Sequence, residues 1–149
     1  MNLEKFAHIV SHIIDFPILS PILLFLALTN TGLNKSQIMI LGPSLATLNL
    51  IIPTLLFFFF LRDGRISDFD MTIRKERRTI FGISTMTLLF SAVLVYYVGT
   101  FHFFVLNVAA FLIALTVFSV TLEWKISVHM ILSCSAIFVA NYLLDWKLA

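Results

Sequence analysis

The sequence predicts an all-α protein, a polytopic transmembrane helix bundle of about five spanning helices in one domain over residues 1–149. Hydrophobic residues make up 60% of the chain and charged residues 12%, and the mean hydropathy is +1.01, values that a water-soluble domain of this size could not cover with polar surface. Charged residues divide the chain into apolar segments near the roughly 20 residues that a spanning helix needs. The 16 Phe residues lack the alternation typical of a transmembrane barrel, which favours helices.

The expected spanning helices share that length and lie at about residues 6–28, 38–61, 79–98, 103–122 and 126–144. Between the second and third lies the longest polar stretch, a loop over residues 62–78 with the sequence RDGRISDFDMTIRKERR. Pro17 and Pro21 should kink or break the first helix, and Pro43 and Pro53 should bend the second, because proline removes a backbone donor and clashes with the preceding turn.

The distribution of Lys and Arg predicts the orientation. The loop 62–78 holds six of the ten basic residues. With this loop inside, Lys5 and Lys125 join it, and only Lys35 and Lys147 lie outside. Basic residues are enriched in short cytoplasmic loops. We therefore expect the amino terminus and the loop 62–78 to be cytoplasmic, in an inner or plasma membrane.

The basic residues that end this loop are candidate phosphate ligands. If the third helix begins near Asp70, which would be a good N-cap, then Arg74, Arg77 and Arg78 share one helical face. Several guanidinium groups on one face match the oxygens of a phosphate or pyrophosphate. Alternatively, the cluster is an ordinary positive loop that sets topology, with an i,i+4 ion pair between Asp70 and Arg74.

A second candidate group lies where the fifth helix is expected to begin. With five spanning helices, the loop before this helix is on the same membrane face as loop 62–78, so Lys125, Ser127 and His129 could converge with the arginines. His129 could donate or accept a proton beside a bound phosphate, and Lys125 and Ser127 could bind it. Alternatively, His129 forms a hydrogen bond between helices, as polar residues in lipid often do.

The remaining polar residues limit the choice of chemistry. His8, His12 and Asp15 follow one stripe of the first helix and could hold a metal ion, but Asp15 could equally accept backbone donors freed by Pro17. We expect no metal and no cofactor. The single cysteine, Cys134, excludes an internal disulfide and a Cys-based zinc site. The net charge of +2 is too small to suggest nucleic acid as a partner.

Two segments resemble a known family. SDFDMTIRKERRTIF at residues 67–81 and WKISVHM at 124–130 resemble a small membrane branch of the type 2 phosphatidic acid phosphatase superfamily. Members often carry an Asp-Phe-Asp stretch leading into an Arg-Glu-x-Arg-Pro-like sequence, and then Lys-Ile-Ser-x-His. In the wider superfamily three motifs bind the phosphate, protonate the leaving group and supply a histidine nucleophile.

The resemblance implies roles for particular residues. Arg77 corresponds to the Arg of the first motif, with Arg78 in the place of its Pro and Asp70 in the place of its Lys. Ser127 and His129 correspond to the Ser and His of the second motif, which makes His129 the candidate catalytic residue. The third motif has no counterpart, because no Arg and no further His follow His129 in the sequence.

Three functions are consistent with these features. The chain could bind a lipid phosphate or pyrophosphate headgroup and hydrolyse it, although whether it is an enzyme stays open without the nucleophile motif. It could be a truncated or degenerate relative that binds the headgroup without turnover. It could also be a structural membrane protein whose basic loop sets topology and contacts anionic lipid. Membrane lipids are the expected partners in each case, and a bundle of this size could form homo-oligomers.

Overall fold

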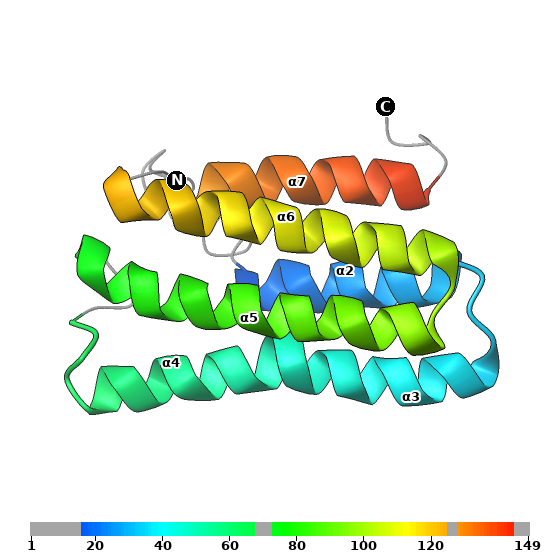
Figure 1. Ribbon diagram of the computed structural model, residues 1–149, viewed down its shortest axis with the longest axis horizontal. Coiled ribbons are helices and arrows are strands. Elements are labelled where there is room, and N and C mark those ends of the chain that lie inside the picture. Colours follow the sequence, from blue (N-terminus) through cyan, green and yellow to red (C-terminus); the bar gives the residue numbers. More distant parts are fainter. Residues whose placement is uncertain (1–15, 68–72, 125–127, 145–149) are drawn as a thin grey trace, which may run out of the picture.

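The computed structural model describes the backbone of residues 16–67, 73–124 and 128–144, and the side chains of these residues other than 16–18, 74 and 128–133. All regular structure in this part of the chain is helical, and five helical rods lie side by side (Figure 1). The all-α prediction is confirmed. The elements are α2 Phe16–Asn30, α3 Lys35–Ala46, the π-helical segment η1 Thr47–Ile51, α4 Ile52–Arg62, α5 Arg74–Val98, α6 Phe101–Glu123 and α7 Val128–Leu143.

Three of the rods are long and apolar enough to cross a membrane: Lys35–Arg62, which joins α3, η1 and α4, and then Lys75–Val98 and Phe101–Glu123. Two shorter apolar helices in the described residues, Leu19–Asn30 and Cys134–Leu143, lie beside them. Large apolar side chains cover the outside of the bundle, and Phe25, Phe58, Phe90 and Phe101 are all more than half exposed. An apolar exterior of this kind is suited to lipid, so the fold is that of an integral membrane protein.

Two helices begin earlier than the sequence suggests. The polar loop expected over 62–78 is shorter, because α5 begins at Arg74. Its N-cap residue is Ile73, which makes no side-chain capping hydrogen bond, so the expectation of Asp70 as N-cap is wrong. Asp70 itself lies outside the described residues. Likewise α3 begins at Lys35, within a segment expected to be a link. The basic residues that start α5 are strong helix formers, so the helix extends past its apolar segment.

Hydrogen bonds between two turns close the end of the bundle opposite the basic segment. Asn34 and Gln37 form a capping box at the start of α3, with both reciprocal bonds at 2.9 Å. Gln37 Nε2 also donates to the carbonyl of Val98 at 2.8 Å, at the end of α5. Thr100 Oγ1 donates to the carbonyl of Thr31 at 2.8 Å. These bonds connect the link between α2 and α3 to the link between α5 and α6.

Two of the prolines lie inside continuous helices. α2 continues through Pro21, so it is not broken there, and α3 continues through Pro43. Pro17 lies next to the boundary of the described residues, so the kink expected there stays a prediction.

Pro53 has a larger effect on the backbone of its rod, which changes to the π-helical segment η1 just before it. Its ring nitrogen cannot donate to the carbonyl of Asn49, and the backbone instead widens, with the N–H of Ile52 bonded to the carbonyl of Thr47. Within this wider turn, Asn49 Nδ2 donates to Ser91 Oγ of α5 at 2.8 Å. The rod of α3 and α4 thus contains a π turn before Pro53, and this turn makes a polar contact with α5.

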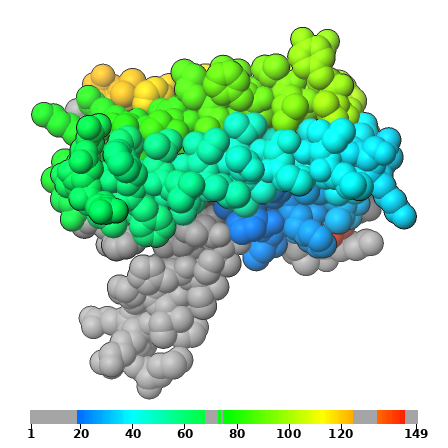
Figure 2. Space-filling model, turned by 90° about the horizontal axis from the view of Figure 1, so that it is seen from below, coloured from blue at the N-terminus to red at the C-terminus, as the bar shows by residue number. Residues whose placement is uncertain are grey.

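The best-packed region lies at the end closed by these turns. Leu41, Leu45, Val95 and Phe103 are buried there and form one cluster. Figure 2 shows the rod of α3 and α4 running across the molecule between α5 on one side and α2 on the other. On the other side of the bundle α7 packs against α2, while α5 makes its most extensive contact with α6. The basic segment lies at the opposite end of the bundle.

Candidate functional site

Four helices begin or end toward the same end of the bundle (Figure 1). α4 ends there at Arg62, α5 begins at Arg74, α6 ends at Glu123 and α7 begins at Val128, because each rod runs antiparallel to the next along the chain. The basic start of α5 and the link between α6 and α7 therefore lie at the same end. This is the backbone arrangement that would allow the two candidate groups to face one bound anion.

The start of α5 concentrates positive charge. Its first five residues are Arg74, Lys75, Glu76, Arg77 and Arg78, four of them basic. The amino end of a helix already carries a partial positive charge, so each cation placed there is unfavourable by about 0.3–1 kcal/mol. The same end offers free backbone N–H groups, and together these features favour a bound anion.

Arg78 is the best-defined member of this group. It is half-buried, and its Nη2 donates to the carbonyl of Leu122 in the last turn of α6. That carbonyl is one of the groups at a helix end that have no intrahelical donor, and it lies at the negative end of the helix dipole. Arg78 Nε is buried and has no hydrogen-bond partner among the described residues. Arg78 therefore joins α5 to α6 and still holds an unused charged donor.

Glu76 and Ser67 connect the loop to the start of α5. The Glu76 carboxylate accepts from the backbone N–H of Ser67 at 3.0 Å and from its hydroxyl at 3.1 Å. Each hydrogen bond to a charged group is worth about 1.5–3 kcal/mol when sheltered and less at an exposed position such as Ser67. The only acid in the first turn of α5 is thus bonded to the loop.

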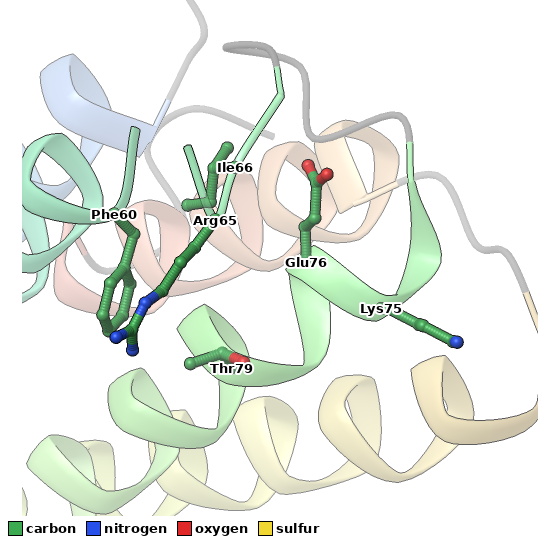
Figure 3. A pocket seen from close by; sticks show the side chains of 6 residues that line it. All are labelled: Phe60, Arg65, Ile66, Lys75, Glu76 and Thr79. Carbon is green, nitrogen blue, oxygen red and sulfur yellow. The ribbon is translucent and has the colours of Figure 1, made fainter. Parts of the chain in front are cut away.

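A cavity of about 170 Å³ lies beside this contact, between the end of α4 and the start of α5 (Figure 3). The Arg65 guanidinium lies over the Phe60 ring at 5.6 Å and pairs with Asp63 at 2.7 Å. Figure 3 shows Lys75 pointing away from Arg65, so these two cations do not converge on the cavity. With its cations dispersed and one already paired, this cavity is a poor anion site.

The other predicted site residues are placed only in part. Arg77 is half-buried on the first turns of α5. Arg74 is the first residue of α5 and His129 the second of α7, and both side chains lie outside the described ones. Lys125 and Ser127 lie outside the described residues altogether, as do His8, His12 and Asp15. The predicted meeting of guanidinium groups with the imidazole of His129 therefore stays a prediction.

Sequence reasoning missed a buried polar contact in the middle of the bundle. Ser91 is fully buried, and its hydroxyl lies 2.8 Å from the carbonyl of Thr87 and 3.0 Å from Asn49 Oδ1, besides accepting from Asn49 Nδ2. The sequence did contain a signal for this contact, because Asn49 is the only Asn or Gln in the apolar segment 38–61. Amide side chains inside a spanning helix usually form a hydrogen bond with another helix.

Comparison of the chain with protein-family models, with curated proteins and with solved structures gave no match.

Proposed function

We propose that this chain is an integral membrane protein of five spanning helices that binds the phosphate headgroup of an anionic lipid at the basic end of the bundle. One observation carries the proposal: four of the first five residues of α5 are basic, at the end of a helix where a cation is unfavourable unless an anion lies nearby. The half-buried Arg78, with its unused Nε donor, adds a reason to prefer a bound anion to a merely solvated positive loop.

The alternative is a structural membrane protein whose basic residues only set topology and attract anionic lipid in general. The two functions differ in which basic residues matter. Arg77 lies on α5 within the proposed site, whereas Arg65 is exposed in the loop and pairs with Asp63. A general attraction depends on total charge, so both arginines should then contribute equally. A built headgroup site should depend on Arg77 far more than on Arg65.

Binding of phosphatidic acid to purified protein in lipid nanodiscs tests this difference. One basic residue near a membrane surface contributes about 1 kcal/mol, which corresponds to about fivefold in affinity. We expect Arg77→Ala to weaken binding by at least about that factor, and Arg65→Ala, the matched control, to leave it unchanged. Equal losses in the two variants would favour the structural alternative, and binding that neither variant alters would refute the headgroup site.

Hydrolysis of the bound lipid is a second candidate, favoured by the resemblance of residues 67–130 to type 2 phosphatidic acid phosphatases. In that case His129 is the catalytic residue, and Arg74, Lys125 and Ser127 assist in holding the phosphate. Purified protein should then release inorganic phosphate from phosphatidic acid, and His129→Ala should abolish the release. No release from the wild-type protein would restrict the function to binding.

The basic end is proposed to face the cytoplasm, because eight of the ten Lys and Arg residues would then lie inside. A single cysteine introduced as Arg62→Cys, in a Cys134→Ala background, should react with a membrane-impermeant maleimide in inverted vesicles and not in intact cells. Labelling in intact cells would show the opposite orientation, and the bound headgroup would then belong to a lipid of the outer leaflet.

A further inference from the structure

A groove of about 470 Å³ runs along the contact between α5 and α6, starting at Arg78. It exists partly because residue 82 is glycine: a Cβ added there would lie 3.4 Å from the ring of Phe118 on α6. The neighbouring hydroxyl of Thr85 is bonded to the carbonyl of Phe81 at 2.7 Å, so it offers little polarity to the groove. The groove is therefore apolar along its length and cationic at one end.

The length of the groove matches one leaflet of a bilayer. It extends along α5 from Arg78 to Phe90, which is about 18 Å at the helical rise of 1.5 Å per residue. Half of the hydrocarbon core of a bilayer is about 15 Å thick. Trp124, 70% exposed at the same end as Arg78, is a residue typical of the membrane interface. The cation thus lies at interface depth, and the apolar groove extends inward to about the midplane.

The groove is open sideways to the surrounding lipid. Met86 and Phe90 on its α5 wall are 57% and 62% exposed, and Leu115 on its α6 wall is 38% exposed. An extended hydrocarbon chain could enter from the bilayer and gain contacts with both walls. Each such carbon contact is weak, and only a chain that lies along much of the groove collects enough of them to matter.

We propose that this groove holds one acyl chain of an anionic lipid whose headgroup lies at Arg78. The inference rests on the proposed function and adds the chemical class of the ligand: a lipid with a long chain, bound by chain and headgroup together. The guanidinium supplies the complementary charge, and its unused Nε donor could bond a phosphate oxygen after a small movement of the side chain.

A second copy of the chain is a poorer occupant of the same groove. Two copies related by an axis normal to the membrane would bring the basic starts of their α5 helices to the same depth, where like charges repel. Covering Arg78 with an apolar helix would also leave a charge buried without an anion, which costs several kcal/mol. Charge complementarity therefore favours a lipid over a protein partner.

The test compares two phosphatidic acids in their binding to the purified full chain: a dioleoyl form, whose chains can fill the groove, and a dihexanoyl form, whose chains cannot. Gly82→Leu fills the groove from its floor, and Met86→Trp fills it from its exposed rim, where the fold tolerates a larger side chain. Ala110→Leu adds bulk at an exposed position of α6 that does not line the groove and serves as the control.

We expect both groove variants to bind the dioleoyl lipid about tenfold more weakly, because they lose roughly ten carbon contacts with its chain. Their affinity for the dihexanoyl lipid should not change. Ala110→Leu should bind both lipids as the wild-type protein does. Undiminished dioleoyl binding by Met86→Trp would overturn the chain site and leave the headgroup site standing. The chain site would also be overturned if the groove variants lost the same affinity for both lipids. It would be overturned as well if they changed the oligomeric state of the protein and left lipid binding unchanged. Failure of the wild-type protein to bind either lipid would refute the proposed function itself.

Discussion

The contact between Asn49 and Ser91 should stabilise the bundle in a way that a double-mutant cycle can isolate. Asn49 Nδ2 donates to Ser91 Oγ at 2.8 Å, and Ser91 is fully buried in α5. The single hydroxyl hydrogen of Ser91 points either to the carbonyl of Thr87 at 2.8 Å or to Asn49 Oδ1 at 3.0 Å. Ser91→Ala removes the acceptor of the Asn49 amide and leaves that amide among apolar groups.

The expected magnitude follows from measured hydrogen bonds between helices in membranes, which average about 0.6 kcal/mol and reach about 1.7. Ser91 has no exposed surface, so water cannot replace the lost hydrogen bond at this residue. The free energy of the bond between Asn49 and Ser91 should therefore lie in the upper half of that range. We expect Ser91→Ala to lower the free energy of unfolding by about 1–1.5 kcal/mol, and the coupling energy between Ser91→Ala and Asn49→Ala to be about 1 kcal/mol.

Reversible unfolding in mixed detergent micelles, with increasing dodecyl sulfate, measures the four free energies that the cycle needs. Ser119→Ala supplies the control, because Ser119 is exposed and its hydroxyl bonds to Leu115 of its own helix at 2.7 Å. Its effect should add to that of Asn49→Ala, since residues that share no partner do not couple. A coupling energy for Asn49 and Ser91 no larger than that for Asn49 and Ser119 would refute the contact.

Substitutions at three further positions test the turns at the other end of the bundle, each by its free energy of unfolding in the same micelles. Gly99→Ala should destabilise by about 1–3 kcal/mol, because its Cβ would lie 2.7 Å from the carbonyl oxygen of Val95, and an unchanged stability would refute this close contact. Gly32→Ala should cost about 1–2 kcal/mol from its φ of +71° alone, since nothing lies near the added Cβ, and Gly32→Asn should cost less. Gln37→Leu should cost about 1–2 kcal/mol by removing both the capping box and the bond to Val98. Gln37→Glu keeps the capping box and loses the bond to Val98, so its stability should lie between those of the wild-type protein and Gln37→Leu.

The all-α class and the order of the apolar helices in the described residues could be predicted from the sequence, because charge spacing reports where apolar segments end. The starts of α3 and α5 could not be predicted in this way. Hydropathy marks the edge of the hydrocarbon, but a helix continues past it wherever the next residues favour helix, as Arg74 to Arg78 do. The π turn before Pro53 was also missed, since a proline in a spanning helix can be accommodated by a kink, a break or a widened turn, and neighbouring helices decide which.

The candidate site was predicted as a set of residue types, and its contacts needed the fold. The sequence assigns Arg78 to phosphate binding, but nothing in it indicates the bond to Leu122, which depends on α5 and α6 lying together. The groove depends on the same contact, because a glycine at 82 becomes informative only when Phe118 is found beside it. Long-range pairs such as these leave no periodic signal in the chain.

The buried cluster and Arg78 lie at opposite ends of the bundle, and this distance bears on how the protein could bind lipid. The buried cluster around Leu41, Val95 and Phe103 and the bonded turns hold the helices together at one end. At the other end, within the part of the chain that the structure describes, Arg78 donates to the carbonyl of Leu122 and has a spare donor. A side chain so placed can exchange that carbonyl for a phosphate oxygen without disturbing the cluster. Substitutions at the packed end should therefore act on stability, and those at Arg78 chiefly on lipid binding.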